Sequence, residues 1–366
     1  MNDVDELKEF VIVHTRAQNL DPERCRALLG RIDNDHDGAA GSWAAEWSRD
    51  AAELERDGDL LEACRYYNMA RFPYVDGAAR GAALDNCVRV FDQWRQDHPD
   101  IQRLDVELDG GRVRCWTSGL SRATPRPLLL FMGGIVTIKE QWAPVLVQAR
   151  RLGMAMVVTE MPGVGENTLR YDEDGPRMLG AVLDALADRA DVGHTYAVAL
   201  SFSGHLALRH ALDDRRIRGI VTSGAPVSDF FTDTQWHSTL PRVTVDTLGH
   251  LAGTKGEEAL ARMTDWALTD SELASLDIPV AYLASRRDEI IPPGETARLR
   301  RGLRHLDILE NDDVHGSPNY AVEARLWTVL SVLRMRRVHN LQRAALSALL
   351  RLRLRGARRR TAGAGA

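Results

Sequence analysis

The sequence predicts an α/β protein, in which a mostly parallel β-sheet carries helices on both faces and a helical domain precedes it. Two observations lead to this prediction. The first hundred residues place apolar residues at helical spacing and contain no strand pattern. From residue 127 onward, short apolar segments alternate with helical stretches, which is typical of a parallel sheet covered on each side.

The composition fits a globular enzyme and argues against several other classes of protein. The chain has 366 residues, of which 44% are hydrophobic and 27% charged, so it can bury a sizeable core. A net charge of −5 gives no reason to expect a nucleic acid as partner. The four cysteines form no CxxC pair, so neither a zinc site nor a redox motif is indicated. We expect no cofactor and no metal.

The first ten residues, MNDVDELKEF, lack the basic start and the apolar core of a signal peptide. No apolar run in the sequence is long enough to span a bilayer. We therefore expect a cytoplasmic protein with reduced thiols and without an integral membrane segment.

Residues 1–100 are expected to form a helical N-terminal cap domain. Segments 42–56 and 58–72 carry apolar and aromatic residues at helical spacing, and Gly58 separates them. Segment 77–96 has the pattern of another amphipathic helix.

Residues 101–340 are expected to form the main domain. A β-hairpin should open it, because apolar and polar residues alternate on both sides of Asp109-Gly110-Gly111. Segment 229–275 interrupts the later alternation and is expected to be a lid over the C-terminal edge of the sheet. The predicted strands of the sheet are 127–132, 155–160, 196–200, 219–223, 279–284 and 306–310.

Residues 341–366 contain many arginines and no acidic residue. An amphipathic helix followed by a disordered tail would fit this segment. We expect a solvated basic tail, and the alternatives are contact with an anionic membrane surface or with a nucleic acid.

Ser201 is the predicted nucleophile. A strand, a tight turn and a helix meet at this serine, and residues two positions away on either side must be small so that strand and helix can pack closely. Glycine is usual at both positions. This sequence has Ala199 and Ser203 there, with Gly204 next. The residues therefore differ from those of the G-x-S-x-G pattern, but the side chains at both positions are small.

Asp288 and His315 are the predicted partners of Ser201, and together they indicate the α/β-hydrolase fold. This fold orders its triad as Ser, then Asp or Glu, then His, and the two later residues here follow the last two predicted strands. His315 would accept the serine proton, and Asp288 would orient the imidazole. Glu289 is the competing acid; we prefer Asp288 because it comes first after its strand.

The predicted oxyanion hole consists of the backbone N–H groups of Phe202 and Gly134. Phe202 follows the nucleophile, and Gly134 belongs to the glycine turn after strand 127–132, which is where this fold supplies its donors. Gly133 and Ile135 of the same turn, and Trp236 in the lid, are candidate substrate contacts. For Trp236 the alternative role is packing.

The sequence resembles the FrsA-like α/β-hydrolases, the group of the fermentation/respiration switch protein. Residues 133–140 (GGIVTIKE) are similar to the GGLxSxKE turn of that group, and residues 160–166 (EMPGVGE) to its DGPGQGE turn. Arg71-Phe72-Pro73, with aromatic residues before it, resembles its N-terminal helical domain. The group includes dihydroxypseudooxynicotine hydrolase and a fungal heptaketide hydrolase, whose triad carries over to Ser201, Asp288 and His315.

The resemblance implies a substrate pocket between the helical and catalytic domains, and relatives with this helical domain tend to form homodimers. The group often has an acidic residue where this chain has Val136, which favours ester or thioester hydrolysis over carbon–carbon cleavage. Lys139 and Glu140 match the group, and we interpret them as a structural ion pair at the start of a helix.

We therefore predict a serine-type hydrolase that cleaves an ester, a thioester or a carbon–carbon bond beside a ketone. Its substrate would be a mid-sized small molecule, such as a polyketide or another secondary metabolite. Two alternatives stay open at this stage. A cyclase, acyltransferase or lyase could use the same triad if water is excluded, and a non-catalytic binding protein could retain the fold.

Overall fold

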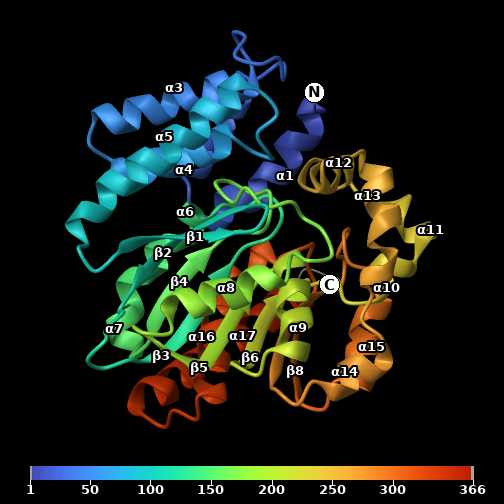
Figure 1. Cartoon of the computed structure of the whole chain (residues 1–366). Coiled ribbons are helices and arrows are strands. Elements are labelled where there is room, and N and C mark those ends of the chain that lie inside the picture. Colours follow the sequence, from blue (N-terminus) through green and yellow to red (C-terminus); the bar gives the residue numbers. More distant parts are fainter. Residues whose placement is uncertain (1, 364–366) are drawn as a thin grey trace.

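The computed structural model describes residues 2–363, and their side chains as far as Arg355. Residues 4–97 are mostly helical, and their core is aromatic: Trp43 contacts Trp47 and Phe72, and Tyr66 contacts Trp47. This core explains the aromatic periodicity of the sequence. In Figure 1 these helices form a layer of their own above the sheet. They are α1 (Val4–Ala17), α2 (Pro22–Leu29), α3 (Trp43–Arg56), α4 (Leu60–Ala70) and α5 (Ala78–Trp94).

The predicted sheet is confirmed. It has eight strands in the order β1-β2-β4-β3-β5-β6-β7-β8; β1 and β2 form an antiparallel hairpin, and β3 to β8 are parallel to one another. The strands are β1 (Gln102–Leu108), β2 (Gly111–Ser118), β3 (Pro127–Met132), β4 (Ala155–Thr159), β5 (Asp191–Ala199), β6 (Ile217–Ser223), β7 (Val280–Ser285) and β8 (Leu306–Asn311). Strand β5 begins five residues before the apolar segment from which it was predicted. Its first four residues are partly buried or exposed, so they carry no continuous apolar pattern.

Helices cover both faces of the sheet. Figure 1 shows α8 (Arg177–Leu186) and α9 (Phe202–Asp213) in front of the strands, with α16 (Ala321–Met335) and α17 (Leu341–Gly363) behind them. The central strands are therefore buried on both sides, and every residue of β4 is buried. This two-sided burial is the reason that the parallel strands are continuously apolar.

Segment 229–275, the predicted lid, consists mainly of short helices. It packs against the N-terminal helices: the backbone N–H of Val243 donates to Glu6 at 3.1 Å, and His250 stacks on Tyr74 with ring centroids 4.4 Å apart. The lid helices are α10 (Asp229–Thr232), α11 (Thr234–His237), α12 (Arg242–Ala252), α13 (Gly256–Arg262) and α14 (Asp270–Ser275).

The close approach of α9 to β6 depends on Gly204. A Cβ atom at this position would lie 2.7 Å from the Cβ of Ala225 and would also collide with Thr222. We expect Gly204→Ala to lower the free energy of unfolding by about 1–3 kcal/mol, because overpacking forces helix and strand apart. Urea denaturation measures this loss. Gly193→Ala is the matched control, because a Cβ there has room, and an equal loss in both variants would contradict the explanation.

Candidate active site

Ser201 occupies a strained turn between β5 and α9. Its backbone has φ 57° and ψ −132°, a left-handed conformation that a non-glycine residue adopts only when its surroundings impose it. The N–H of Ser201 donates to Ser223 at 2.8 Å, and its carbonyl accepts from Gly204 at 2.8 Å. The buried Ser203 hydroxyl lies 2.9 Å from the carbonyl of Leu200. A serine therefore fits where the elbow pattern has glycine.

The structure brings the three predicted catalytic side chains together. The Oγ of Ser201 lies 3.0 Å from the Nε2 of His315. The Nδ1 of the same imidazole lies 2.9 and 3.0 Å from the two carboxylate oxygens of Asp288. The three residues come from the turns after β5, β7 and β8, so three separate strand ends converge at one edge of the sheet.

Asp288 and Glu289 have different partners. Asp288 accepts the backbone N–H groups of Ile290 and Ile291 at 3.0 and 2.8 Å, which holds its carboxylate toward the imidazole. Glu289 instead accepts the backbone N–H of His315 at 3.0 Å. Asp288 is therefore the acid that faces the imidazole, which agrees with the preference from the sequence. Glu289 instead holds the backbone of the loop that carries His315.

The pKa of His315 lies above its ordinary value of 6.5. Burial lowers this pKa, but the charge and hydrogen bond of Asp288, together with the charge of Glu289, outweigh the effect of burial. The imidazole of His315 therefore binds a proton more strongly than the imidazole of a free histidine does.

Gly224 also belongs to the site and was missed by the sequence analysis. It follows β6 with φ 57°, and a Cβ there would lie 2.6 Å from Cε1 and 2.9 Å from Nδ1 of the His315 ring. Only glycine leaves room for the imidazole at this position. The signal was available, because a glycine directly after a predicted strand stands on the same edge of the sheet as Ser201.

The two residues predicted to form the oxyanion hole lie next to Ser201. A Cβ on Gly134 would be 3.1 Å from the Cβ of Ser201, so this turn passes directly over the serine. Thr137 secures the turn, because its N–H and its hydroxyl both donate to the Gly134 carbonyl at 3.2 Å. Phe202 is the first residue of α9, and a helix leaves such N–H groups without a partner inside the helix.

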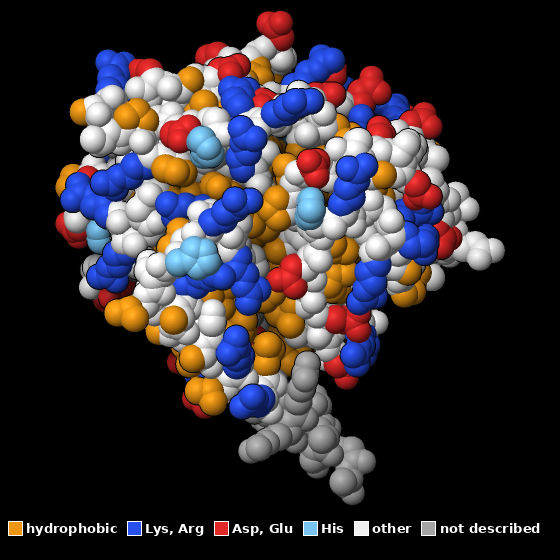
Figure 2. Space-filling view, turned by 90° about the horizontal axis from the view of Figure 1, so that it is seen from below, with side chains coloured by type: hydrophobic (Ala, Val, Ile, Leu, Met, Phe, Trp, Pro, Cys, Tyr) orange, Lys and Arg blue, Asp and Glu red, His pale blue; other side chains and the backbone are white. Residues whose placement is uncertain are grey.

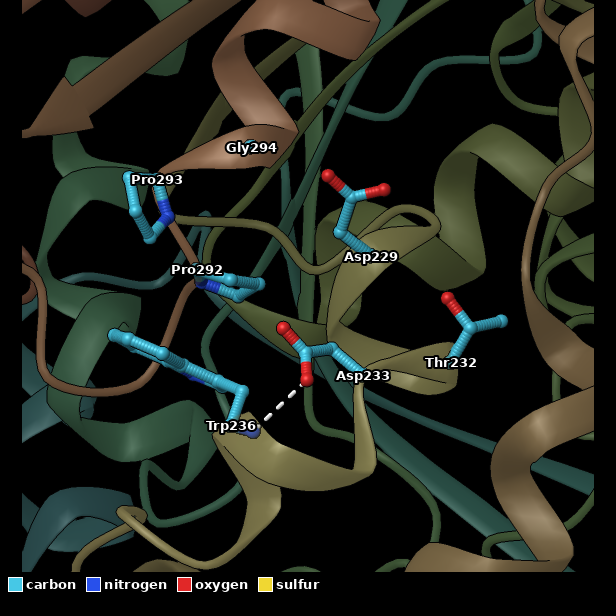
Figure 3. Close-up of a pocket in the computed structure, with 7 residues that line it drawn as sticks. All are labelled: Asp229, Thr232, Asp233, Trp236, Pro292, Pro293 and Gly294. Carbon is cyan, nitrogen blue, oxygen red and sulfur yellow. Dashed lines mark hydrogen bonds between the residues drawn. The ribbon is translucent and has the colours of Figure 1, made fainter.

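The candidate substrate contacts have different surroundings. Gly133 packs against Thr137 and Trp142, and Ile135 is buried. Trp236 donates its indole N–H to the Ile290 carbonyl at 2.7 Å. It lines a surface pocket between the lid and the loop after Asp288 (Figure 3), and the residues lining that pocket include no member of the triad. The structure thus assigns Trp236 a packing contact, and substrate contact by these three residues stays a prediction.

Lys139 forms a wider ion network than the expected pair. Its ammonium lies 3.0 Å from Glu140, 3.2 Å from Glu160 and 2.8 Å from Glu166. Glu160 also accepts the backbone N–H groups of Lys139 and Glu166, at 2.9 and 2.8 Å. Burial raises the pKa of the Glu160 carboxyl to about 7, and Lys139 opposes that rise. The network joins the glycine turn to the loop after β4.

The helical region fixes the same turn from its other side. The buried guanidinium of Arg71 donates to the backbone carbonyl of Val136, and it also binds Asn68 at 2.9 Å. Asn68 in turn donates to Gln141 at 3.1 Å. The end of α4 therefore contacts the turn that carries Gly134.

Comparison with known proteins agrees with this architecture. Residues 35–292 match the family described as FrsA-like, Esterase FrsA-like. The curated Esterase FrsA of Citrobacter koseri is 26% identical over 314 residues, which cover 79% of this chain and 73% of that protein. The solved structure of AbyA5 wild type is 52% identical with a TM-score of 0.93, covering 96% of this chain and 99% of that one.

A more distant solved structure shares the fold. The 2,6-dihydroxy-pseudo-oxynicotine hydrolase is 18% identical, with a TM-score of 0.70 over 87% of this chain and 94% of that one. The resemblance of the sequence to this group of α/β-hydrolases is thereby confirmed.

Replacing the buried lysine tests whether its network stabilises the turn. We expect Lys139→Met to lower the free energy of unfolding by about 3–5 kcal/mol, because it leaves buried carboxylates without their shared cation. Thermal or urea unfolding measures the loss. Lys255→Met removes an exposed lysine as control, and a loss below about 1 kcal/mol for Lys139→Met would contradict a structural role.

Proposed function

The chain belongs to the FrsA-like esterase family, and we propose that it hydrolyses an ester or related acyl bond of a mid-sized organic substrate with Ser201 as nucleophile. The observation that carries the proposal is the continuous hydrogen-bonded line from the Ser201 hydroxyl through His315 to Asp288. A hydroxyl becomes a competent nucleophile when an oriented base can take its proton at this distance.

Each step of the proposed reaction uses groups that lie at the site. The Oγ of Ser201 adds to the carbonyl carbon while its proton passes to Nε2 of His315. The N–H groups of Phe202 and Gly134 stabilise the resulting oxyanion. Collapse of this intermediate breaks the bond to the leaving alcohol or thiol, which takes the proton from His315. Water then attacks the acyl-serine and gives a proton to His315. Collapse of this second intermediate releases the acid, and His315 returns the proton to the Oγ of Ser201.

The substrate pocket is proposed to lie between the N-terminal helices and the sheet. Three observations support this placement: α4 contacts the glycine turn through Arg71, the lid packs on α1 through Glu6, and Arg16 of α1 donates to Asn319 in the loop after His315 at 3.1 Å. These contacts surround the edge of the sheet where Ser201 lies. A polyketide or another secondary metabolite is the proposed substrate class. Val136 supplies no acid at the turn, which favours an ester or thioester over a carbon–carbon bond.

Loss of the serine hydroxyl tests the nucleophile. We expect Ser201→Ala to reduce kcat/KM for short acyl esters by roughly 10⁵-fold, because the covalent step is lost. A fluorophosphonate probe should label the parent protein and Ser271→Ala, an exposed serine of α14, but not Ser201→Ala. Labelling that survives in folded Ser201→Ala would contradict the assignment.

Incorporation of ¹⁸O from labelled water distinguishes hydrolysis from the other reactions that the same triad can catalyse. In H₂¹⁸O, the proposed mechanism places one ¹⁸O in the carboxylic acid product, because water resolves the acyl-serine. A cyclase, acyltransferase or lyase would release its product without that label. Mass spectrometry of the products from a panel of esters, thioesters and 1,3-diketones makes this measurement.

The pH dependence tests the tuning of His315. The base must be neutral, so activity is lost as the pH falls through the raised pKa of His315, and the acidic limb of kcat/KM should lie above pH 6.5. Glu289→Gln removes a nearby negative charge and should move this limb to lower pH. Asp312→Asn, an exposed carboxylate of the same loop, should move it less. A limb that moves to higher pH in Glu289→Gln would contradict the electrostatic account.

A further inference from the structure

Helix α17 has two apolar faces, and only one of them packs on the protein. Leu346, Leu350 and Leu354 belong to the core or pack against it. Leu341, Leu349 and Leu352 point the other way, with 90%, 43% and 65% of their surfaces exposed. Among the side chains that the structure describes, the other large hydrophobic ones that are exposed are Ile12, Val147 and Val322, which come from three different parts of the chain. Exposed leucines are thus concentrated on this helix.

The exposed residues form one stripe. Ala345 and Ala348 are exposed as well, and the spacing of positions 341, 345, 348, 349 and 352 places them all on one side of an α-helix. Arg351, Arg353 and Arg355 are exposed and lie beside this stripe, on its two flanks. Within the described residues, no carboxylate lies at ion-pair distance from these three arginines.

Charge is strongly separated along the chain. All 52 acidic residues lie at or before Glu323, whereas 11 arginines follow it. Figure 2 shows one face of the molecule, on which arginine or lysine side chains lie next to hydrophobic ones. A chain with a net charge of −5 thus has a local excess of positive charge after Glu323, in the part of the chain that carries the leucine stripe of α17.

We propose that the exposed face of α17 docks on the surface of an anionic lipid bilayer. The leucine stripe would enter the boundary between headgroups and acyl chains, while the flanking arginines bind lipid phosphates and carboxylates. The acidic remainder of the protein does not prevent this, because salt screens charges more than about 10 Å from the membrane. Across the described residues, no helix is long and apolar enough to cross a bilayer, so the contact is interfacial.

The same features disfavour two other partners. A nucleic acid would use the arginines but leave the leucines in water, and no aromatic residue follows Trp327 to stack on bases. A second copy that pairs through α17 would bury the leucines but supply no carboxylate to Arg351, Arg353 and Arg355, because no acidic residue follows Glu323. A bilayer satisfies both the apolar stripe and the positive charge.

Vesicle sedimentation tests the proposal with the full chain. Vesicles of phosphatidylcholine containing 30% phosphatidylserine should bind the protein at low salt, and vesicles of phosphatidylcholine alone should not. Replacing Arg351, Arg353 and Arg355 with Gln should weaken binding by roughly a hundredfold. The pair Leu349→Gln and Leu352→Gln should weaken it as well. The control pair Val147→Gln and Arg177→Gln, exposed and outside α17, should bind like the parent.

The variants leave the inward leucines intact, so unchanged ester hydrolysis and an unchanged Tm show that each is folded. Three results would overturn the proposal: equal binding by the leucine variant, binding to an RNA oligonucleotide but not to anionic vesicles, or a leucine-dependent dimer in light scattering without vesicle binding. Each of these outcomes is independent of whether Ser201 is the nucleophile.

Discussion

The left-handed backbone at Ser201 is the constraint around which the rest of the structure is organised. A side chain in this conformation costs about 1–3 kcal/mol, so neighbouring contacts must hold it. Here the backbone bond to Ser223 and the tight crossing of α9 over β6 at Gly204 do so. The result is a hydroxyl raised above the strand ends, where the imidazole of His315 and the glycine turn can both reach it.

The turn that faces this hydroxyl is immobilised by buried charges. Lys139 and its three glutamates hold it from one side, and Arg71 holds it from the helical region. Buried ions are expensive to desolvate, so apolar residues would serve stability at least as well. Charges supply direction instead. Arg71 binds the backbone carbonyl of Val136, and Glu160 accepts the backbone N–H of Lys139, so both fix the backbone of the glycine turn, on which an oxyanion hole would depend.

The N-terminal helices do more than cover the sheet. They contact the glycine turn through Arg71, the lid through Glu6 and the loop after His315 through Arg16. Substrate choice in an FrsA-like chain of this kind would therefore depend on the helices and the lid, while the strand ends supply the chemistry.

The order of the strands was accessible from the sequence, and so was the proposal of Ser201, Asp288 and His315 as the triad, because both depend on local pattern. Apolar segments located the strands to within a few residues, and the order of Ser201, Asp288 and His315 along the chain matched the ends of three of them. The tertiary structure decided which atoms meet. It placed Glu289 on the His315 backbone, required glycine at position 224, and joined Lys139 to Glu160 and Glu166 across two loops. These contacts join residues far apart in the chain, and spacing along a sequence carries no information about the direction in which a side chain points after folding.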